Sequence, residues 1–300
     1  MGWRTVVISN ISKLDLKSNY LSIRQVNEVT RVLIDEIDTL LIETTAASLT
    51  AALLVELAQK KVNVVFCDAL HNPFFYVHPL YGSHNSSLRI RQQIKWKKTQ
   101  KDIVWKEIVT QKIHFQKEVL EYFGLNEYKM LDEYKSNVEI GDKTNREGHA
   151  AKVYFNALFG KEFSRRDDMV ENACLNYGYS IILSLVSREI VITGCLTQIG
   201  IHHDNQFNPF NLSCDIMEPF RPLIDFVVYK NRWEEINSEV KKEIINILNH
   251  KVTIAGQKQY LSNAISMYCK NIIDFFEEKK ERKMYHIDYE LQDYENYSDV

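Results

Sequence analysis

The segment Gly194–Phe226, GCLTQIGIHHDNQFNPFNLSCDIMEPFRPLIDF, decides how the rest of the chain is arranged. It carries two adjacent histidines, His202 and His203, then a turn rich in Asn, Phe and Pro, and then an acidic stretch with Asp215 and Glu218. The turn residues indicate a loop rather than a regular element. Such a loop folds its two flanks against each other, so that an imidazole from the first flank meets carboxylates from the second.

The acidic flank favours a hard metal ion. Asp215 and Glu218 are three residues apart, so a helix beginning near Asp215 would place both carboxylates on one face of its first turn. Pro219 suits that turn, because its missing N–H would be unpaired there anyway. Mg²⁺ prefers oxygen ligands, and Mn²⁺ also accepts an imidazole. Acidic residues in a first turn also occur simply to complement the helix dipole, so a third ligand from elsewhere is needed.

Composition limits the class of protein. The chain has 300 residues, 45% hydrophobic and 26% charged, which is a globular balance with room for one large or two smaller domains. Its formal net charge is −3, so any nucleic-acid surface must be local. Five cysteines without CxxC spacing favour reduced thiols in a cytoplasmic protein over a disulfide frame or zinc site. We recognise no signal peptide, and the longest apolar region, Tyr179–Leu196, is interrupted by Arg188 and Glu189, so we expect no membrane contact.

Residues 1–80 have the pattern of a small β-sandwich-like domain. Short runs of β-branched or alternating apolar residues predict strands, and Ser18-Asn19 predicts a hairpin turn. The expected strands are Thr5–Ile8, Leu14–Leu16, Leu21–Ile23, Val32–Ile34, Thr39–Ile42 and Val62–Cys67. A helix capped by Ser48 is expected before the last strand, which would make a βαβ unit. That unit lacks a glycine-rich phosphate loop, so a nucleotide site there is not expected.

The composition changes after a stretch rich in turn residues, Pro73–Ser87. We therefore place a linker at 81–87 and an all-helical domain at 88–300, which makes the fold class α+β. Helices are expected near 88–122, 126–136, 145–159, 168–192, 218–230, 236–249 and 257–281. The tail after about residue 284 is acidic and rich in tyrosine, and we interpret it as a partly disordered terminus. Its acidic residues are Asp288, Glu290, Asp293, Glu295 and Asp299.

The first expected helix is strongly basic. Its cationic side chains outnumber the acidic Asp102 and Glu107, with Trp96 and Trp105 interleaved. Those cations are Arg89, Arg91, Lys95, Lys97, Lys98, Lys101, Lys106 and Lys112. The pattern fits two interpretations, a solvated helix face or a contact with the phosphates of DNA.

A third acidic candidate lies in Asn145–Phe155, NREGHAAKVYF. Asn145 is an N-cap candidate, so Glu147 would stand in the first turn of a helix. By itself, Glu147 also fits a surface residue that complements the helix dipole.

Taken together, three segments resemble the integrase of CRISPR adaptation, the CRISPR-associated protein "Cas one". They are NREGHAAKVYF, the histidine-containing GIHH and DIMEPFRPLID, in the order and spacing of that family. The stretches MGWRTVVI, ETTAASLT and YGSHNSS resemble its type II branch. The resemblance covers essentially the whole chain. It implies an N-terminal β domain that dimerises and a helical catalytic domain.

The resemblance also implies site residues. A single Mg²⁺ or Mn²⁺ ion is expected on Glu147, His203 and Glu218, where many relatives have Asp at the third position. The family's histidine stands three residues after a glycine, which from Gly200 selects His203. Four neighbours are implied to orient a ligand or bind a phosphate: Arg221, Asp215, His149 and His202. Arg221 also fits an ion pair with Asp215 or Asp225 instead.

The implied activity is that of a metal-dependent DNA endonuclease and integrase, which joins the 3′-hydroxyl ends of a captured DNA to the CRISPR repeat. The implied partners are double-stranded DNA, a second copy of the chain, and the second adaptation protein, "Cas two", in a hetero-hexamer. In the type II branch the effector nuclease and a fourth adaptation protein are added. A different class also fits the basic helix: a DNA-binding scaffold without chemistry of its own, which recruits a nuclease.

Overall fold

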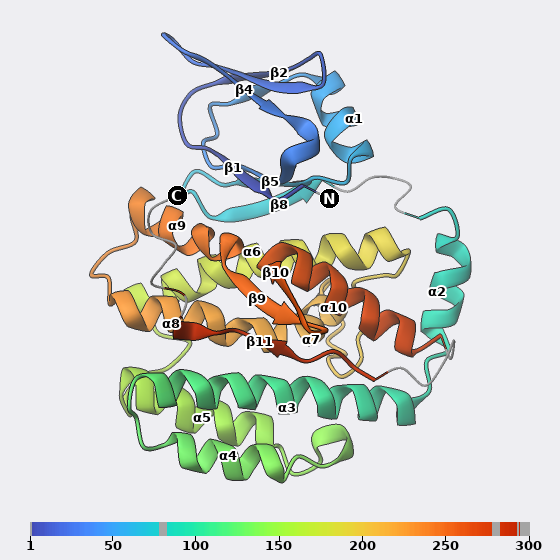
Figure 1. Cartoon of the computed structure of the whole chain (residues 1–300), viewed down its shortest axis with the longest axis vertical. Coiled ribbons are helices and arrows are strands. Elements are labelled where there is room, and N and C mark those ends of the chain that lie inside the picture. Colours follow the sequence, from blue (N-terminus) through green and yellow to red (C-terminus); the bar gives the residue numbers. More distant parts are fainter. Residues whose placement is uncertain (1, 78–82, 278–282, 293, 295–300) are drawn as a thin grey trace. The chain divides into compact units, whose positions relative to one another are not determined.

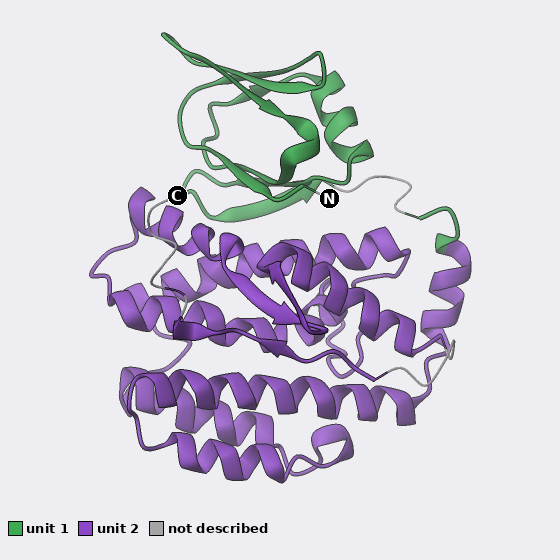
Figure 2. Cartoon of the chain, in the orientation of Figure 1, with its two compact units in different colours: residues 1–86 green, residues 87–300 purple. Residues whose placement is uncertain are grey.

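The computed structural model describes residues 2–77, 83–277, 283–292 and 294. The chain divides into two units between Ser86 and Ser87 (Figure 2). Strands and one helix form the first unit, and the second is mostly helical (Figure 1). This order confirms the α+β fold class.

The N-terminal unit contains two four-stranded sheets. One has the order β1 (Arg4–Ile8), β5 (Ile37–Ile42), β7 (Asn63–Cys67) and β8 (Pro73–Val77), in which only β8 is antiparallel to its neighbour. The other has the order β4 (Val29–Leu33), β3 (Tyr20–Arg24), β2 (Lys13–Lys17) and β6 (Ser48–Leu49). A 3₁₀ turn, η1 (Ile34–Glu36), separates β4 from β5.

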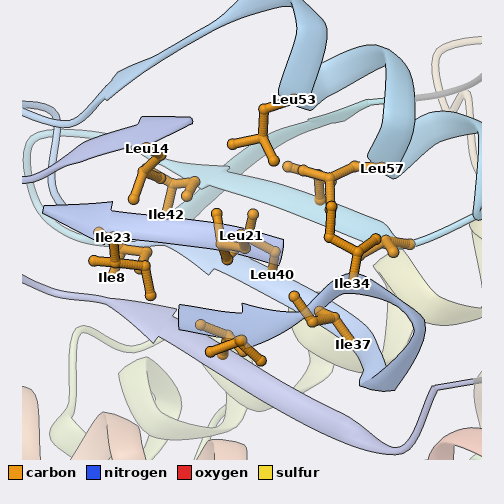
Figure 3. Packing of buried hydrophobic residues seen from close by; sticks show 14 residues of the cluster. Ile8, Leu14, Leu21, Ile23, Ile34, Ile37, Leu40, Ile42, Leu53 and Leu57 are labelled. Atoms are coloured by element: carbon orange, nitrogen blue, oxygen red, sulfur yellow. The ribbon is translucent and has the colours of Figure 1, made fainter. Parts of the chain in front are cut away.

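The core of this unit lies between the two sheets and helix α1 (Ala51–Gln59) (Figure 3). Buried side chains point into it from all three sources, which makes the unit a sandwich with its own apolar interior. Figure 3 labels Ile8, Leu40 and Ile42 from the first sheet, Leu14, Leu21 and Ile23 from the second, and Leu53 and Leu57 from α1.

Two local predictions in this unit are confirmed. Ser18 and Asn19 both have positive φ, 49° and 68°, as a two-residue hairpin turn between β2 and β3 requires. Strand β5, helix α1 and strand β7 form a βαβ unit, because β5 and β7 pair in parallel.

Two details differ. Thr50, and not Ser48, caps α1, since its side chain accepts the N–H of Leu53 while Ser48 lies in β6. The beginning of the turn-rich stretch Pro73–Ser87 is strand β8, whose Phe75 stacks on Phe66 of β7 with ring centroids 4.5 Å apart. The prolines of this stretch concealed an edge strand, where proline is tolerated.

Nine helices and three 3₁₀ turns are described in the second unit. The helices are α2 (Ser86–Ile94), α3 (Lys98–Tyr122), α4 (Tyr128–Ser136), α5 (Arg146–Phe159), α6 (Val170–Thr193), α7 (Asn211–Met217), α8 (Arg221–Asn231), α9 (Ser238–Asn246) and α10 (Leu261–Phe275). The turns are η2 (Ile140–Asp142), η3 (Glu218–Phe220) and η4 (Ile247–Asn249). Helix α3 packs against α4, α5 and η3, and α6 packs against α7, α8, α9 and α10 (Figure 1).

The single basic helix expected over 88–122 is two helices. The chain leaves the helical path at Lys95–Lys97, between α2 and α3. Trp96 lies in this break, where it is buried and stacks on Phe276 with ring centroids 3.9 Å apart. The break allows that indole to be buried against Phe276, a long-range contact that a helical pattern alone cannot reveal.

The second unit also contains a three-stranded sheet that the sequence pattern did not predict. Its order is β10 (Gln257–Tyr260), β9 (Lys251–Ile254) and β11 (Ile287–Asp288), all antiparallel. The expected helix 257–281 therefore begins only at Leu261. Ala255 and Gly256 have φ of 51° and 75°, a two-residue hairpin turn that carries no Asn or Asp signal.

Part of the tail, whose composition indicates a partly disordered terminus, is ordered. Ile287 of β11 is buried, and the hydroxyl of the buried Tyr289 donates to the carbonyl oxygen of Pro219 at 2.7 Å. Of the acidic tail residues, Asp288 and Glu290 belong to this ordered part. Asp293, Glu295 and Asp299 lie outside the described residues. The described helices include none that is both long and apolar enough to cross a bilayer.

Candidate functional site

Two side-chain caps place Glu147 in the first turn of α5. The carboxylate of Asp142 accepts the N–H of Arg146 at 2.8 Å and that of Glu147 at 3.0 Å. Asn145 accepts the N–H of Gly148 at 3.3 Å, which confirms it as the predicted N-cap. Three otherwise unpaired N–H groups are thereby satisfied, and the Glu147 side chain is left partly exposed.

The loop with the two histidines is held by one buried carboxylate. Asp215 accepts the backbone N–H groups of Ile201, His202 and His203 at 2.6, 3.0 and 3.1 Å. Its Oδ1 also contacts Nδ1 of the His203 ring at 2.6 Å. A side chain at Gly200 would not fit, because a Cβ there would lie 2.2 Å from the carbonyl oxygen of His203. The loop conformation therefore depends on Asp215 and on glycine at position 200.

The two histidine rings have different neighbours. The exposed His202 ring lies flat on Trp105 of α3, with centroids 4.2 Å apart and planes 3° apart. The hydrogen bond with Asp215 raises the pKa of His203 against the effect of burial, with further help from the charges of Asp215 and Glu218. His203 is thus the ring oriented by a carboxylate, and His202 is packed against the helix.

Glu218 stands in η3, at the junction of α7 and α8, and is buried. Its Oε1 accepts Nε–H of Arg221 at 2.9 Å, and its Oε2 lies 2.5 Å from Nζ of Lys112. Burial by itself would raise the pKa of this carboxyl, but the charges of Arg221 and Lys112 outweigh it and lower the pKa to about 2. Glu218 is therefore held as a carboxylate.

The Lys112 ammonium joins the two predicted acidic ligands. This buried residue of α3 forms ion pairs with both Glu147 of α5 and Glu218 of η3. Burial would lower the pKa of Lys112, but the charges of Glu218 and Glu147 outweigh it and raise the pKa. The positive charge on α3 thus brings together carboxylates from α5 and η3, which are far apart in the sequence.

We compared the chain with known proteins. The family model of the CRISPR associated protein Cas1 matches residues 5–243. The chain belongs to the Cas1 family. It is 34% identical over 263 residues to a CRISPR-associated endonuclease Cas1 of Neisseria meningitidis serogroup C (strain 8013), and the alignment covers 86% of each chain. The family resemblance inferred from the sequence is confirmed, while the type II branch stays a prediction.

Solved structures share the fold of this Cas1 chain. A casposase bound to integration product superposes with a TM-score of 0.75 at 19% identity, over 95% of this chain and 93% of that one. A Cas6-RT-Cas1–Cas2 complex superposes with a TM-score of 0.69 at 15% identity, over 92% of this chain and 35% of that one. At such low identity these matches establish the fold alone.

The predicted acidic helix of this Cas1 chain begins earlier than expected. Helix α7 starts at Asn211, so Asp215 stands inside it and Glu218 follows its end. The two carboxylates therefore have different partners rather than one shared ligand: Asp215 holds backbone N–H groups, and Glu218 faces cations. Arg221 pairs with Glu218, and not with Asp215 or Asp225 as one alternative had it. Its guanidinium lies over the ring of Tyr179, 4.6 Å from the centroid.

His149 does not join these groups. It is exposed on α5, and its ring centroid lies 6.2 Å from that of Tyr134 on α4. Its expected role beside the metal has no support in the structure. Lys112, by contrast, belongs to the site, although the sequence pattern groups it with the basic run. The sequence did contain a signal for its burial. Lys112 lies seven residues after Trp105, so both fall on the apolar face of the helix.

The predicted DNA-contacting cations divide into two groups. Arg91, Lys95, Lys97 and Lys98 are exposed, as the prediction requires. Arg89 is mostly buried and forms an ion pair with Glu277, while Lys101 donates to the carbonyl oxygen of Gly200 at 2.7 Å. The last two therefore have structural partners within the chain.

A second basic surface lies beside the site. A pocket of about 460 Å³ is lined by the end of α4, η2 and the start of α5. Three cations, Lys106, Lys143 and Arg146, line it together with one acid, Glu139. Arg146 immediately precedes Glu147, so this pocket adjoins the first turn of α5. The sequence prediction missed it because its cations come from separate segments: α3, the turn after η2 and the first residue of α5.

The side chains at this site are of the chemical types that bind a divalent cation. Across the described residues no group of three or more His, Cys, Asp or Glu side chains is gathered closely enough to hold a metal ion. Glu147 and Glu218 nevertheless converge on a cation, the Lys112 ammonium. His203 is close enough to Glu218 for each charge to affect the other's pKa, and Asp215 holds its Nδ1 as the carboxylate partner of a metal-binding histidine commonly does.

Proposed function

We propose that this Cas1 chain is a metal-dependent DNA endonuclease and integrase of CRISPR adaptation. The observation that carries the proposal is the convergence of Glu147 and Glu218 on one positive charge, beside a His203 ring that Asp215 orients. The Neisseria relative is named an endonuclease, and the similar casposase is bound to an integration product. Both similarities support the same class of reaction.

Glu147, Glu218 and Nε2 of His203 would hold a Mg²⁺ or Mn²⁺ ion. When bound, the ion supplies positive charge next to the phosphodiester group that reacts. The chain's own residues do the remaining work. Asp215 and Gly200 hold the His203 backbone in place, and the partly exposed Arg221 guanidinium is positioned to take a phosphate oxygen. Phosphates of the flanking DNA would lie against Lys106, Lys143 and Arg146.

The proposed reaction is a transesterification. The 3′-hydroxyl of the captured DNA gives up its proton to solvent, its oxygen attacks a phosphorus atom of the repeat, and a new P–O bond forms. The bond from that phosphorus to the 3′-oxygen of the preceding repeat nucleotide breaks, and the released oxygen takes up a proton. The number of phosphodiester bonds stays the same, so the step needs neither a nucleotide cofactor nor an oxidant.

The proposed partners are double-stranded DNA, a second copy of this chain joined through the N-terminal unit, and Cas2. The solved Cas6-RT-Cas1–Cas2 complex supports the last of these. The hetero-hexamer and contacts with the effector nuclease or a fourth adaptation protein belong to the same proposal. Light scattering of the chain alone and with Cas2 measures both associations.

The test is a strand-transfer assay with a 3′-hydroxyl DNA end and a repeat duplex, in Mn²⁺ or in chelator. Wild type and Glu239→Gln, a change on the exposed face of α9, are expected to join the DNA only with metal. Glu147→Gln is expected to join none while binding DNA normally. Joining in chelator, or normal joining by Glu147→Gln, contradicts the proposal. DNA binding with no joining by wild type under any condition supports the scaffold instead.

A further inference from the structure

Lys112 occupies the position where the two acidic ligands meet. Its side chain is 9% exposed, and its ammonium pairs with Glu147 and lies 2.5 Å from Oε2 of Glu218. Besides these ion pairs, Oε2 of Glu218 makes no hydrogen bond to any described residue. Among the described residues, the ammonium of Lys112 thus forms the ion pair with this buried oxygen, and no hydrogen-bond donor competes for it.

The charges around this position balance without a metal ion. Glu147 and Glu218 contribute two negative charges, and Lys112 and Arg221 contribute two positive charges. Two like-charged carboxylates in a buried site repel each other unless a cation lies between them. Lys112 therefore keeps the site assembled when no metal is bound.

A divalent cation added to this balanced group would meet repulsion from Lys112. The repulsion between charges a few ångströms apart is strong where water is largely excluded. The carboxylate oxygens are also shared, because the same two side chains would have to bind both cations. The lysine side chain is a flexible four-carbon stem that can carry its charge away.

We infer that the Lys112 ammonium is an internal substitute for the metal ion, and that a divalent cation binds Glu147 and Glu218 only by displacing it. The inference rests on the proposed function, since it assumes that these two carboxylates are metal ligands. Metal binding is then an exchange of one cation for another. The lysine competes with the metal ion for the same two carboxylates, so the wild-type protein binds the metal more weakly than it would without Lys112.

The test uses Lys112→Met in the full chain, because methionine keeps the unbranched shape and helix preference but removes the charge. Lys117→Met is the matched control on the same helix, where the lysine pairs with Glu121 and Asp132 instead. Mn²⁺ binding is measured by calorimetry and by the electron paramagnetic resonance signal of free Mn²⁺, without DNA and without any activity assay.

Lys112→Met is expected to bind Mn²⁺ at least about tenfold more tightly than wild type, since a competing positive charge is gone. In chelator its Tm is expected to fall by several degrees, because the buried Glu218 and the partly exposed Glu147 lose the cation between them. Saturating Mn²⁺ should restore that Tm. Lys117→Met should match wild type in Mn²⁺ affinity.

The outcomes separate the two proposals. If wild type binds Mn²⁺ and Glu147→Gln does not, but Lys112→Met binds no more tightly than wild type, the exchange is wrong and the metal site stands. If neither wild type nor Lys112→Met binds Mn²⁺, both proposals are wrong. Lys112→Gln serves as a second neutral variant should the methionine variant not fold. It must also tighten Mn²⁺ binding for the inference to hold.

Discussion

Asp215 and Glu218 are buried carboxylates three residues apart, and the structure uses them in opposite ways. Asp215 accepts three backbone N–H groups and contacts one imidazole, so it positions a loop. Glu218 is surrounded by the positive charges of Lys112 and Arg221, so it is a cation site. The difference teaches that the surroundings of a carboxylate, and not its type or spacing, decide between positioning and ion binding.

Of these two carboxylates, Glu218 is expected to give the larger effect on activity when its charge is removed. Glu218→Gln is expected to reduce strand joining on the order of 10³-fold, the usual size for loss of an essential charged group in an active site. Single-turnover strand-transfer rates at saturating Mn²⁺ provide the measurement. DNA affinity should stay within a factor of two or so of wild type. If more Mn²⁺ fully restored the strand-joining rate of this variant, Glu218 would not be essential for the reaction.

Asp215→Asn should have a smaller effect on activity and a clear effect on stability. The amide keeps the shape but turns one acceptor into a donor that faces backbone N–H groups, which should cost about 1–3 kcal/mol. Strand joining should fall roughly 10- to 100-fold, as for other groups that orient a ligand. Urea unfolding and strand-transfer rates provide the two measurements. An unchanged stability would contradict the positioning role.

The two histidines test the same distinction within one loop. His203→Ala should eliminate metal-dependent joining, because it removes the ring that Asp215 orients toward the carboxylates. His202→Ala should keep most of the activity and lose only a stacking contact with Trp105, worth about 0.5–1.5 kcal/mol of stability. A Mn²⁺ titration of strand transfer by both variants decides between them. An inactive His202→Ala beside an active His203→Ala would show that the ligand is the other ring.

The pKa of Glu218 leads to a pH dependence of stability. Its folded-state pKa of about 2 lies below an unfolded value of about 4.3, so the stabilisation is present above the unfolded pKa and is lost as pH falls through the folded one. The shift corresponds to about 3 kcal/mol. Without metal, the free energy of unfolding of wild type should exceed that of Glu218→Gln at pH 5, and the difference should shrink toward pH 2. A difference that is independent of pH would contradict the ion pairs.

The smallest expected effect, on DNA affinity, comes from exposed lysines away from Asp215 and Glu218. Changing the exposed Lys95, Lys97 and Lys98 together to Ala should lower the slope of log affinity against log salt by about 0.7–0.9 for each lost phosphate contact. Lys101 is left unchanged because it holds the carbonyl oxygen of Gly200. Fluorescence anisotropy with a DNA duplex over a range of salt concentrations provides the slope. An unchanged slope would mean that this surface faces solvent or a protein.

The partners of Glu147 lead to a prediction about stability without metal. Repulsion among Glu147, Glu218 and Asp215 alone would make Glu147→Gln stabilise the metal-free protein. Glu147 is instead paired with Lys112, and Asp215 is occupied by N–H donors. Glu147→Gln should therefore leave the metal-free Tm equal or lower, which thermal denaturation in chelator measures.

The amino-acid sequence by itself determined the fold class, the βαβ unit, the hairpin at Ser18-Asn19 and the cap at Asn145. These depend on neighbours in the chain, on turn chemistry and on apolar periodicity, which a sequence displays directly. The family followed from three short segments in order. These segments also supplied Glu147, His203 and Glu218 as candidates, without saying what each contacts.

Only the tertiary structure decided the rest. The break at Trp96 depends on an indole that packs on Phe276, some 180 residues away in the chain. The hairpin at Ala255-Gly256 is completed by a strand from the tail. The roles of Asp215 and Lys112 depend on which groups from other elements come within hydrogen-bonding distance. A buried charge takes its function from partners brought together by folding, and the spacing of residues along the chain does not contain that information.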